Sequence, residues 1–368
     1  MNEQVSPVKV SVILPVYNAG SALSRALDSA LGQTLHEIEV IAVDDCSTDE
    51  SSRILSDCAA SDPRLKILRQ PENSGTLSAR SRGLRTCLGE YVLFLDPDDF
   101  LDPETAAELS ELADREKLDV IHFGTKEFSS SPDGAMKPRY NWTPPKEELI
   151  TGKGQVLRHL LVSGGIWSLC FKMIRTEVIR RALAEAEDFY CTMGEDLYFY
   201  LLTAFHADSL RVISRPYYNY DTGSGITSPK KVSPEKFKRS AATVLDALNR
   251  SEVFLRRNGI LDDAELTAGW NKIVRDQFLI LWNRWYSRLA PGTRGEIGEY
   301  LLDKAWNKEL FLLSIFDEND YLRENEEFLK FSSGIYRFLN YIFPKHSFLR
   351  MKIKSWYKKM KNRRKERK

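Results

Sequence analysis

Cysteine is scarce and scattered in this sequence. The five cysteines among 368 residues form no Cys-x-x-Cys motif and follow no regular spacing. A disulfide framework and a zinc cluster both need closely or regularly spaced cysteines, so we expect neither. Few and unpaired cysteines are typical of a protein from a reducing compartment.

Long apolar segments are also missing. No stretch of about 18 uncharged apolar residues occurs, so the sequence predicts no transmembrane helix. The first ten residues, MNEQVSPVKV, lack a basic stretch followed by an apolar run, and we therefore expect no signal peptide. A Gly-x-Gly-x-x-Gly motif is absent after the first apolar run, which disfavours a dinucleotide-dependent oxidoreductase.

Charge is distributed unevenly along the chain. The net charge is +1, but residues 345–368 hold twelve Lys and Arg against one Glu, so the rest of the chain is net acidic. A basic segment of this kind predicts an anionic partner of its own, either a membrane surface or a nucleic acid. The body of the chain carries no basic stripe, which favours the membrane surface.

Apolar, β-branched runs alternate with segments of helical periodicity. This alternation predicts crossover units and a mostly parallel sheet with helices on both faces, which is an α/β fold. From about residue 234 to 333 the pattern is helical, whereas the proline-rich residues 129–150 predict a loop. The predicted strands of the sheet cover residues 8–17, 38–43, 65–68, 91–95 and 120–124.

Acidic residues follow two of these strands directly. Asp44 and Asp45 end the second strand, and Asp96, Asp98 and Asp99 follow the fourth. Open α/β sheets bind ligands beyond the carboxyl ends of their strands, so these carboxylates are expected in a cleft. Carboxylates two residues apart can share Mg²⁺ or Mn²⁺ together with a diphosphate. Helix capping is the alternative role, but two clusters after two strands favour ligand binding.

Five segments together resemble the family 2 glycosyltransferases with the GT-A fold. The resemblance extends to about residue 228 and implies a nucleotide-diphospho-sugar transferase fold with a helical C-terminal extension. It implies transfer of a sugar with inversion, from a nucleoside diphosphate donor that we expect to be a UDP-sugar. The expected acceptor is a saccharide or lipid-linked molecule in cell-surface polysaccharide or glycoconjugate synthesis. The segments are VSVILPVYN at 10–18, VDDCSTDES at 43–51, NSGTLSAR at 73–80, GEYVLFLDPDD at 89–99 and GEDLYF at 194–199.

The resemblance assigns the donor pocket to the first three segments. It implies that Pro15, Tyr17 and Asn18 line the nucleotide pocket. Asp45 matches the carboxylate that hydrogen-bonds the base edge, with Asp44 beside it. Arg80 matches the basic residue near the donor phosphates. One departure is Cys46, which stands where the family usually has a small residue, commonly glycine; we expect it to be a packing residue.

The remaining segments match the reacting groups. Asp96, Asp98 and Asp99 match the family's DxD motif, which implies Mg²⁺ or Mn²⁺ as cofactor. Asp98 is expected to contact the ribose or the metal, and Asp99 is expected to be the main metal ligand. Asp196 matches the general base, with its neighbour Glu195 as the alternative. Among aromatic residues, Trp167 and the tyrosines at 217, 218 and 220 are candidates for the acceptor side or for the core.

The sequence predicts three parts: a GT-A domain at 1–230, a helical region at 231–333 and a basic amphipathic tail at 334–368. Apolar residues at helical spacing followed by interleaved aromatic and basic residues are typical of an interfacial segment. We therefore expect a peripheral protein at the cytoplasmic face of the membrane, with no nucleic-acid partner and a possible homo-oligomer. Two other classes of protein are compatible with the sequence, an inert GT-A scaffold and a nucleic-acid-binding protein that uses the tail.

Overall fold

The structure is a computed structural model that describes residues 7–130, 136–222, 232–289, 294–307 and 310. The chain divides into two compact units. The first comprises Met1–Ser228 and Asp246–Gly269, and the second comprises Pro229–Leu245 and Trp270–Lys368. The predicted domain boundaries at 230 and 333 stay predictions, and the predicted tail at 334–368 lies outside the described residues.

A single mixed sheet forms the centre of the first unit. Its strands run in the order β3-β2-β1-β4-β9-β6-β10-β5, with β7 paired to β6 and β8 paired to β10. β3, β2, β1 and β4 are parallel, and β9 is antiparallel to both of its neighbours, β4 and β6. The strands are β1 Val10–Val16, β2 Ile38–Asp44, β3 Leu65–Arg69, β4 Tyr91–Phe94, β5 Phe100–Leu101, β6 Val120–Ser130, β7 Met136–Trp142, β8 Glu148–Thr151, β9 Lys172–Arg175 and β10 Ser209–Asp221.

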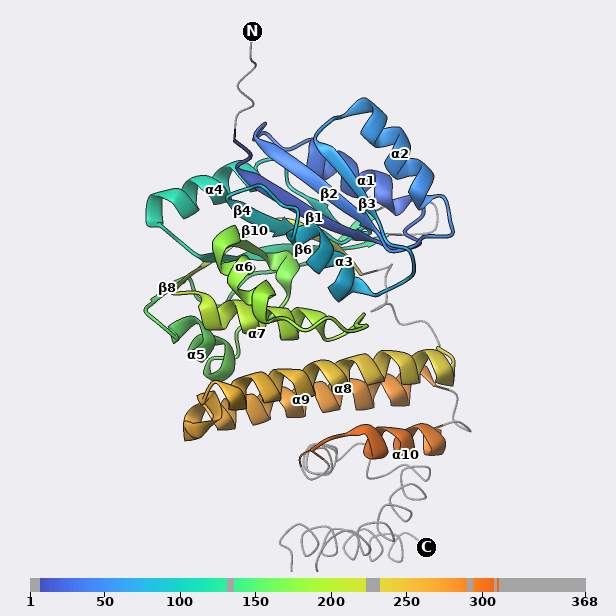
Figure 1. Ribbon diagram of the computed structural model, residues 1–368, viewed down its shortest axis with the longest axis vertical. Helices are drawn as coiled ribbons and strands as arrows, with labels where there is room; N and C mark the ends of the chain where they lie inside the picture. The colour runs from blue at the N-terminus through green and yellow to red at the C-terminus, as the bar shows by residue number, and fades with distance from the viewer. Residues whose placement is uncertain (1–6, 131–135, 223–231, 290–293, 308–309, 311–368) are drawn as a thin grey trace, which may run out of the picture. The chain divides into compact units, whose positions relative to one another are not determined.

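Seven of the described helices, α1 to α7, lie entirely within the first unit and pack around its sheet. Figure 1 shows α3 and α6 in front of the strands, and α1 contacts both α2 and the strand β5. Apolar residues at helical spacing bury one side of each; in α1 these are Leu23, Ala26, Leu27 and Ala30. The helices are α1 Ala22–Leu31, α2 Ser51–Ser61, α3 Thr76–Leu84, α4 Thr105–Glu116, α5 Gln155–Val162, α6 Thr176–Glu185 and α7 Glu195–His206, with a 3₁₀ turn η1 at Leu169–Phe171.

The strand order reverses between β1 and β4. The chain moves outward from β1 to β2 and β3 and then returns to place β4 on the other side of β1. Loops on the two sides of such a reversal diverge at the carboxyl ends of the strands and leave a crevice there. The loop after β1 and the acidic loop after β4 therefore flank the position at which an open sheet binds its ligand.

The loop predicted for residues 129–150 is only partly present, because β7 and β8 form within it. β7 pairs antiparallel with β6, and β8 pairs antiparallel with β10. Most side chains of β7 are exposed, so its sequence is polar. β7 also contains Pro138, which an edge strand tolerates because one row of its N–H groups faces away from the ladder. Because these strands are polar and β7 contains a proline, they show no apolar periodicity from which the sequence could predict them.

The second unit is helical where the structure describes it. Helices α8 (Pro234–Arg257) and α9 (Ala264–Arg288) each belong partly to both units, with the 3₁₀ turn η2 at Ile260–Asp262 between them. Helix α10 (Arg294–Lys304) lies in the second unit, where Lys238 pairs with Glu296. The Phe278 and Trp306 rings pack 5.6 Å apart. None of the described helices is long and apolar enough to cross a membrane.

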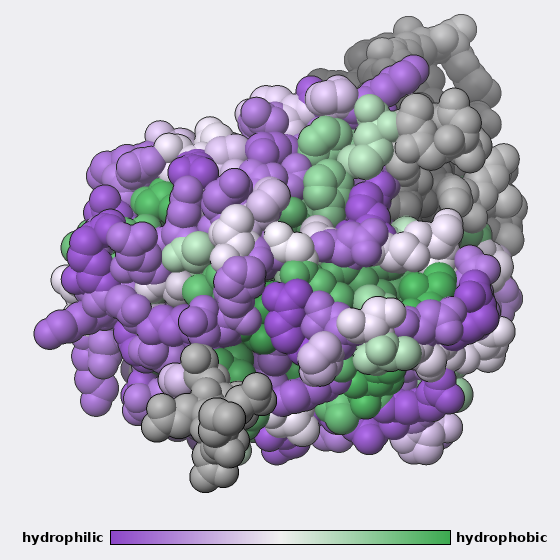
Figure 2. Space-filling model, turned by 90° about the horizontal axis from the view of Figure 1, so that it is seen from above, coloured by the Kyte–Doolittle hydropathy of each residue, from purple (hydrophilic) through white to green (hydrophobic). Residues whose placement is uncertain are grey.

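The face drawn in Figure 2 is hydrophilic over most of its area, with smaller hydrophobic areas between the polar residues. Among the described residues, the large hydrophobic side chains that are exposed come from loops, two edge strands and two helices, rather than from one element. They are Tyr17, Leu88, Tyr140, Leu149, Tyr190, Val253 and Ile280.

Candidate active site

The acidic loop after β4 is held in place by the end of β10. Asp99 is almost completely buried, and its Oδ2 accepts a hydrogen bond from the Tyr218 hydroxyl at 2.7 Å. Its Oδ1 accepts the backbone N–H of Asp221, also at 2.7 Å. The Tyr218 hydroxyl in turn accepts the N–H of Asp96. Burial raises the pKa of Asp99 well above its ordinary value, and the neighbouring carboxylates of Asp98 and Asp96 add to the effect.

Arg25 of α1 supports the same loop from its other side. Its Nη2 donates to the carbonyl oxygen of Asp98 at 2.5 Å and lies 3.2 Å from Oδ2 of Asp221. The guanidinium also lies over the Phe100 ring. Arg25 and Asp221 are not among the residues predicted from the sequence, and Tyr218 was predicted only for the acceptor side or the core, because each acts here through a contact that is distant in sequence. An arginine on the sheet-facing side of an amphipathic helix was the available signal for Arg25.

Arg80 of α3 is the centre of a buried cluster of charges. Its Nη2 donates to Oδ1 of Asp96 at 2.9 Å, and its Nη1 pairs with Oδ1 of Asp196 and with Oε1 of Glu195, the latter at 3.3 Å. Only 4% of its side chain is exposed. Burial opposes the charge, but the carboxylates of Asp196 and Asp96 outweigh it and hold the Arg80 pKa well above its ordinary value. The predicted contact of Arg80 with donor phosphates stays a prediction; in this structure the guanidinium joins carboxylates from two loops.

The Glu195–Asp196 pair begins helix α7. Gly194 precedes it with a φ of +91°, and the exposed N–H groups of a first helical turn favour negative charge. Burial and the charge of Asp196 together raise the pKa of Glu195 to about 8, against the opposing charge of Arg80. The Asp196 side chain remains 25% exposed. Of the two carboxyl groups, Asp196 is therefore the more accessible to a substrate.

The two aspartates after β2 are bonded within the protein. Asp44 is fully buried and accepts hydrogen bonds from Ser47 N–H and the Ser52 hydroxyl; burial alone would raise its pKa, but these bonds lower it. Asp45 Oδ1 accepts the side-chain amide of Gln70 and the N–H of Ser74, each at 2.8 Å. Both aspartates thus stabilise the loops at the carboxyl edge of the sheet.

Gly75 connects this edge to the charge cluster. Its N–H donates to Oδ2 of Asp45 at 2.8 Å, and it caps the helix that carries Arg80. Its φ is +88°, and a Cβ at this position would lie 2.9 Å from the carbonyl oxygen of Cys191, three residues before Gly194. Glycine is therefore required here both by the backbone conformation and by the close approach of the segment that leads into α7.

The remaining predicted residues, Pro15, Tyr17 and Asn18, lie at or just after the end of β1. Pro15 lies within β1, whose residues are all buried, whereas Tyr17 just beyond it is 49% exposed. Asn18 has a φ of +48°, and its Oδ1 accepts the N–H of Thr48 at 2.8 Å, which ties the loop after β1 to the loop after β2. Tyr17 is thus free of the strand and available to a ligand, as the predicted nucleotide pocket requires.

The candidate metal ligands offer oxygen atoms only. Asp96 and Asp98 are partly exposed, whereas Asp99 is buried with both oxygens already accepting hydrogen bonds. Among the described residues, no group of three or more His, Cys, Asp or Glu side chains is arranged to hold a metal ion. Mg²⁺ needs only one or two protein carboxylates when phosphate oxygens and water complete its shell, so this donor set fits such an ion.

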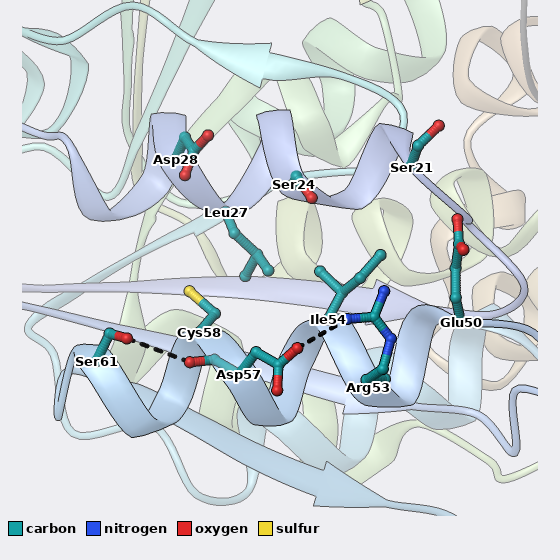
Figure 3. Close-up of a pocket in the computed structure, with 10 residues that line it drawn as sticks. All are labelled: Ser21, Ser24, Leu27, Asp28, Glu50, Arg53, Ile54, Asp57, Cys58 and Ser61. Atoms are coloured by element: carbon teal, nitrogen blue, oxygen red, sulfur yellow. Dashed lines mark hydrogen bonds and ion pairs between the residues drawn. The ribbon is translucent and has the colours of Figure 1, made fainter.

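A separate groove lies between α1 and α2, away from these residues (Figure 3). Its lining includes the exposed ion pair of Arg53 with Asp57, 2.9 Å apart, and the Ser61 hydroxyl bonded to the Asp57 carbonyl. None of the predicted site residues lines it. The candidate active site is the charged cluster at the carboxyl edge of the sheet.

A parallel β3-β2-β1-β4 core with an acidic loop at the reversal of strand order is the arrangement of the GT-A fold, as predicted. Residues 11–181 match the family model described as glycosyl transferase family 2. The predicted resemblance of the chain to this family is therefore confirmed.

Several curated proteins are similar to this chain. The uncharacterized glycosyltransferase EpsJ of Bacillus subtilis (strain 168) is 31% identical over 217 residues, which cover 57% of this chain and 60% of EpsJ. Chondroitin synthase of Escherichia coli is 32% identical over 49% of this chain and 25% of its own length. The poly(ribitol-phosphate) β-N-acetylglucosaminyltransferase TarS of Staphylococcus aureus (strain Mu50 / ATCC 700699) is 28% identical over 68% of this chain and 46% of TarS. The chain thus spans less than two thirds of the length of each of these relatives.

A similar solved structure is the crystal structure of S. aureus TarS 1-349 in complex with UDP-GlcNAc. It has a TM-score of 0.49 and 23% sequence identity, and the alignment covers 85% of this chain and 93% of TarS 1-349.

Proposed function

We propose that this chain is an inverting glycosyltransferase that moves a sugar from a nucleoside diphosphate to a saccharide or lipid-linked acceptor. The observation that carries the proposal is the Arg80 cluster. One buried guanidinium joins Asp96 of the acidic loop to Asp196 at the start of α7, at the carboxyl edge where open sheets bind ligands. Inversion needs a base and a leaving-group site on opposite sides of the anomeric carbon. The start of α7 supplies the base, and the acidic loop supplies the leaving-group site.

In the proposed reaction, Asp196 removes the proton from the acceptor hydroxyl. The acceptor oxygen forms a bond to the anomeric carbon while the bond from that carbon to the diphosphate breaks, and the bonding electrons leave with the diphosphate. Arg80 holds Oδ1 of Asp196, which fixes the carboxylate in place for the transfer. Asp98, with Asp96 and Asp99 in the same loop, would hold Mg²⁺ or Mn²⁺, which neutralises charge on the leaving diphosphate.

The nucleotide pocket is proposed at the ends of β1 and β2. The exposed ring of Tyr17 can stack on a base. Asp45 is buried and already accepts hydrogen bonds from Gln70, Ser74 and Gly75, and its carboxylate has capacity for one more from a base edge. UDP-GlcNAc is the first donor to test, because TarS, by name an N-acetylglucosaminyltransferase, matches 68% of this chain. Synthesis of a polysaccharide is proposed on the same ground, since chondroitin synthase is another relative.

The test is a screen of UDP-sugars for nucleotide release, each with and without Mn²⁺ or Mg²⁺ and with saccharide acceptors. Release that depends on both donor and metal is the expected result. The stereochemistry of the product, read from the anomeric coupling constant in NMR, tests inversion. Donor binding without turnover for any acceptor would instead support the inert scaffold. Binding to DNA with steep salt dependence but not to anionic vesicles would support the nucleic-acid alternative.

A further inference from the structure

Residues 164–168, Gly-Gly-Ile-Trp-Ser, form a segment between α5 and η1 to which the proposed reaction assigns no role. Gly164 has a φ of +75°, and Trp167 is partly exposed. A large aromatic ring beside two glycines has little local structure to hold it. The position of Trp167 therefore depends on contacts from elsewhere in the fold.

Lys172 of β9 supplies those contacts. The lysine is fully buried, and its Nζ donates to the carbonyl oxygen of Ile166 at 2.7 Å and to that of Ser168 at 2.7 Å. These two carbonyls belong to the residues directly before and after Trp167. One ammonium group therefore holds the backbone of Trp167 on both sides.

Burial of a lysine is costly, so its contacts need to be complete. The third side of the Lys172 ammonium faces the Tyr200 ring, with Nζ 4.1 Å from the ring centre. Burial lowers the Lys172 pKa to about 7, and the charge of Asp196 opposes this. Both the ammonium and the neutral amine have enough N–H groups for the two carbonyls, so the hydrogen bonds persist in either form.

The same contacts connect the Trp167 segment to helix α7 and to Arg80. Tyr200 lies four residues after Asp196 on α7, so the two side chains project from the same face of the helix one turn apart. At the other end of the segment, Arg80 donates to the sulfur of Cys170, three residues after Trp167, at 3.7 Å. The segment that contains Trp167 is therefore linked to two residues near the proposed base Asp196. Arg80 contacts Asp196 directly, and Tyr200 lies one helical turn after it on α7.

Two of the three other aromatic candidates on the acceptor side are unsuitable, whereas the third, Tyr220, is partly exposed. Tyr218 is fully buried, and its hydroxyl is bonded to Asp99; Tyr217 is also buried, and its hydroxyl donates to Glu108. Neither ring offers a face to a ligand. Trp167 is partly exposed, and Lys172 holds its backbone on both sides.

We propose that Trp167 is a stacking platform for a pyranose ring of the acceptor, and that Lys172 is the positioning residue that holds this platform in place. The inference deepens the proposed function and rests on it. The C–H face of a pyranose is apolar and packs on an aromatic ring, and a preordered ring loses little conformational entropy on binding.

The first experiment compares Trp167→Ala with Trp167→Phe in the full chain. The probes are methyl β-glycosides of glucose, galactose and N-acetylglucosamine, observed by saturation-transfer difference NMR in the presence of UDP. We expect the saccharide signal to fall about tenfold in the alanine variant and to be largely kept in the phenylalanine variant. An equal signal in the alanine variant, or no saccharide signal from a wild-type protein that binds UDP, overturns the proposal.

The second experiment tests Lys172 through a double-mutant cycle. Lys172→Met should lower the saccharide signal as Trp167→Ala does, but in the Trp167→Ala background it should add less than about twofold. Thermal unfolding checks that each variant is folded, and Lys172→Gln, which retains two N–H donors, is expected to lie between wild type and Lys172→Met. Full additivity, or a wild-type signal from folded Lys172→Met, overturns the positioning role.

UDP affinity, measured by calorimetry on every variant, distinguishes a failure of the proposed donor chemistry from a failure of the proposed saccharide site at Trp167. Unchanged UDP binding with lost saccharide binding supports the role of Trp167 within the proposed function. If wild type binds no nucleotide but its saccharide signal still depends on Trp167, the proposed donor chemistry fails and the saccharide site stands.

Discussion

Arg80 contacts Asp196 although the two residues are 116 positions apart, and its other terminal nitrogen lies 2.9 Å from Asp96 Oδ1. The pair connects α3 to the first turn of α7, and the second contact adds the acidic loop. A carboxylate held in this way has a defined orientation but remains 25% exposed. This combination is what a general base requires.

We expect Asp196→Asn to keep donor binding and to lose sugar transfer by about 10²-fold or more, the scale for removal of a general base. Asparagine retains the shape and can still contact Arg80 through its carbonyl oxygen, so the fold should be unaffected. Calorimetry with the donor and turnover assays measure the two effects separately. Glu195→Gln is the matched control; if Asp196→Asn has wild-type affinity and rate, the base lies elsewhere, with Glu195 as the next candidate.

We expect turnover to require Mg²⁺ or Mn²⁺ and to be abolished by Asp99→Ala. Because Asp99 is buried and bonded to Tyr218 and to the Asp221 N–H, its loss should also lower the free energy of unfolding by about 2 kcal/mol. Asp98→Ala is the partner variant, expected to lose turnover with a smaller change in stability because Asp98 is partly exposed. Urea unfolding and nucleotide release measure the two quantities. Full turnover in excess chelator would contradict the metal requirement.

The stability of the protein should fall as the pH rises toward 8, and Glu195 is the reason. Its folded-state pKa, raised to about 8 by burial and by Asp196 against the opposing charge of Arg80, exceeds the ordinary carboxyl value. The folded state therefore binds the proton more tightly than the unfolded state, so this contribution is complete below about pH 4 and is lost as the pH rises through about 8. Glu195→Gln should flatten the dependence between about pH 5 and 8. Parallel slopes for both proteins in urea unfolding would contradict the assignment.

Cys46→Gly should stabilise the protein slightly. Cys46 has a φ of +63°, a conformation that glycine adopts without a steric penalty. We expect a gain of about 0.5 kcal/mol, because the relieved strain of about 1 kcal/mol is partly offset by the greater freedom of glycine in the unfolded chain. Cys46→Ala is the control, since it removes the sulfur but keeps the Cβ and should bring no gain. A larger gain from alanine than from glycine, measured by thermal unfolding, would show that strain is not the cause.

Truncation after Gly334 should release the protein from anionic vesicles while leaving donor hydrolysis intact. Each Lys or Arg near an anionic surface contributes about 1 kcal/mol, and residues 345–368 hold twelve of them. Binding of the full chain should weaken with salt, since exposed charges are screened over about 8 Å at physiological ionic strength, and the apolar side chains should leave a salt-resistant remainder. Co-sedimentation measures both, and equal sedimentation of the two proteins would exclude the tail as the anchor.

The polar edge of the sheet was the main part of the fold that sequence analysis misjudged. Residues 136–142 and 148–151 read as a loop because they are polar and contain Pro138, yet they pair with β6 and β10. A strand with exposed side chains has no apolar periodicity, and only its partner strand determines that it forms. The strands β1, β2, β3 and β4 and the start of β6 were predicted correctly, because continuous apolar runs of their length have few other stable environments. The buried strand β9 was missed, because its four residues include Lys172 and Arg175 and form no continuous apolar run.

The sequence alone determined the alternation of the first four strands with helices, the position of the carboxylates at strand ends and the likeness to family 2 glycosyltransferases. These depend on local periodicity and on residues close together in the chain. Only the tertiary structure decided that Arg80 joins Asp96 to Asp196, that Asp99 faces inward and that Lys172 holds the backbone of Trp167. The physical reason is that a buried charge is stabilised by whichever partners the folded chain places within about 3 Å of it, and those partners come from distant segments that no local pattern relates.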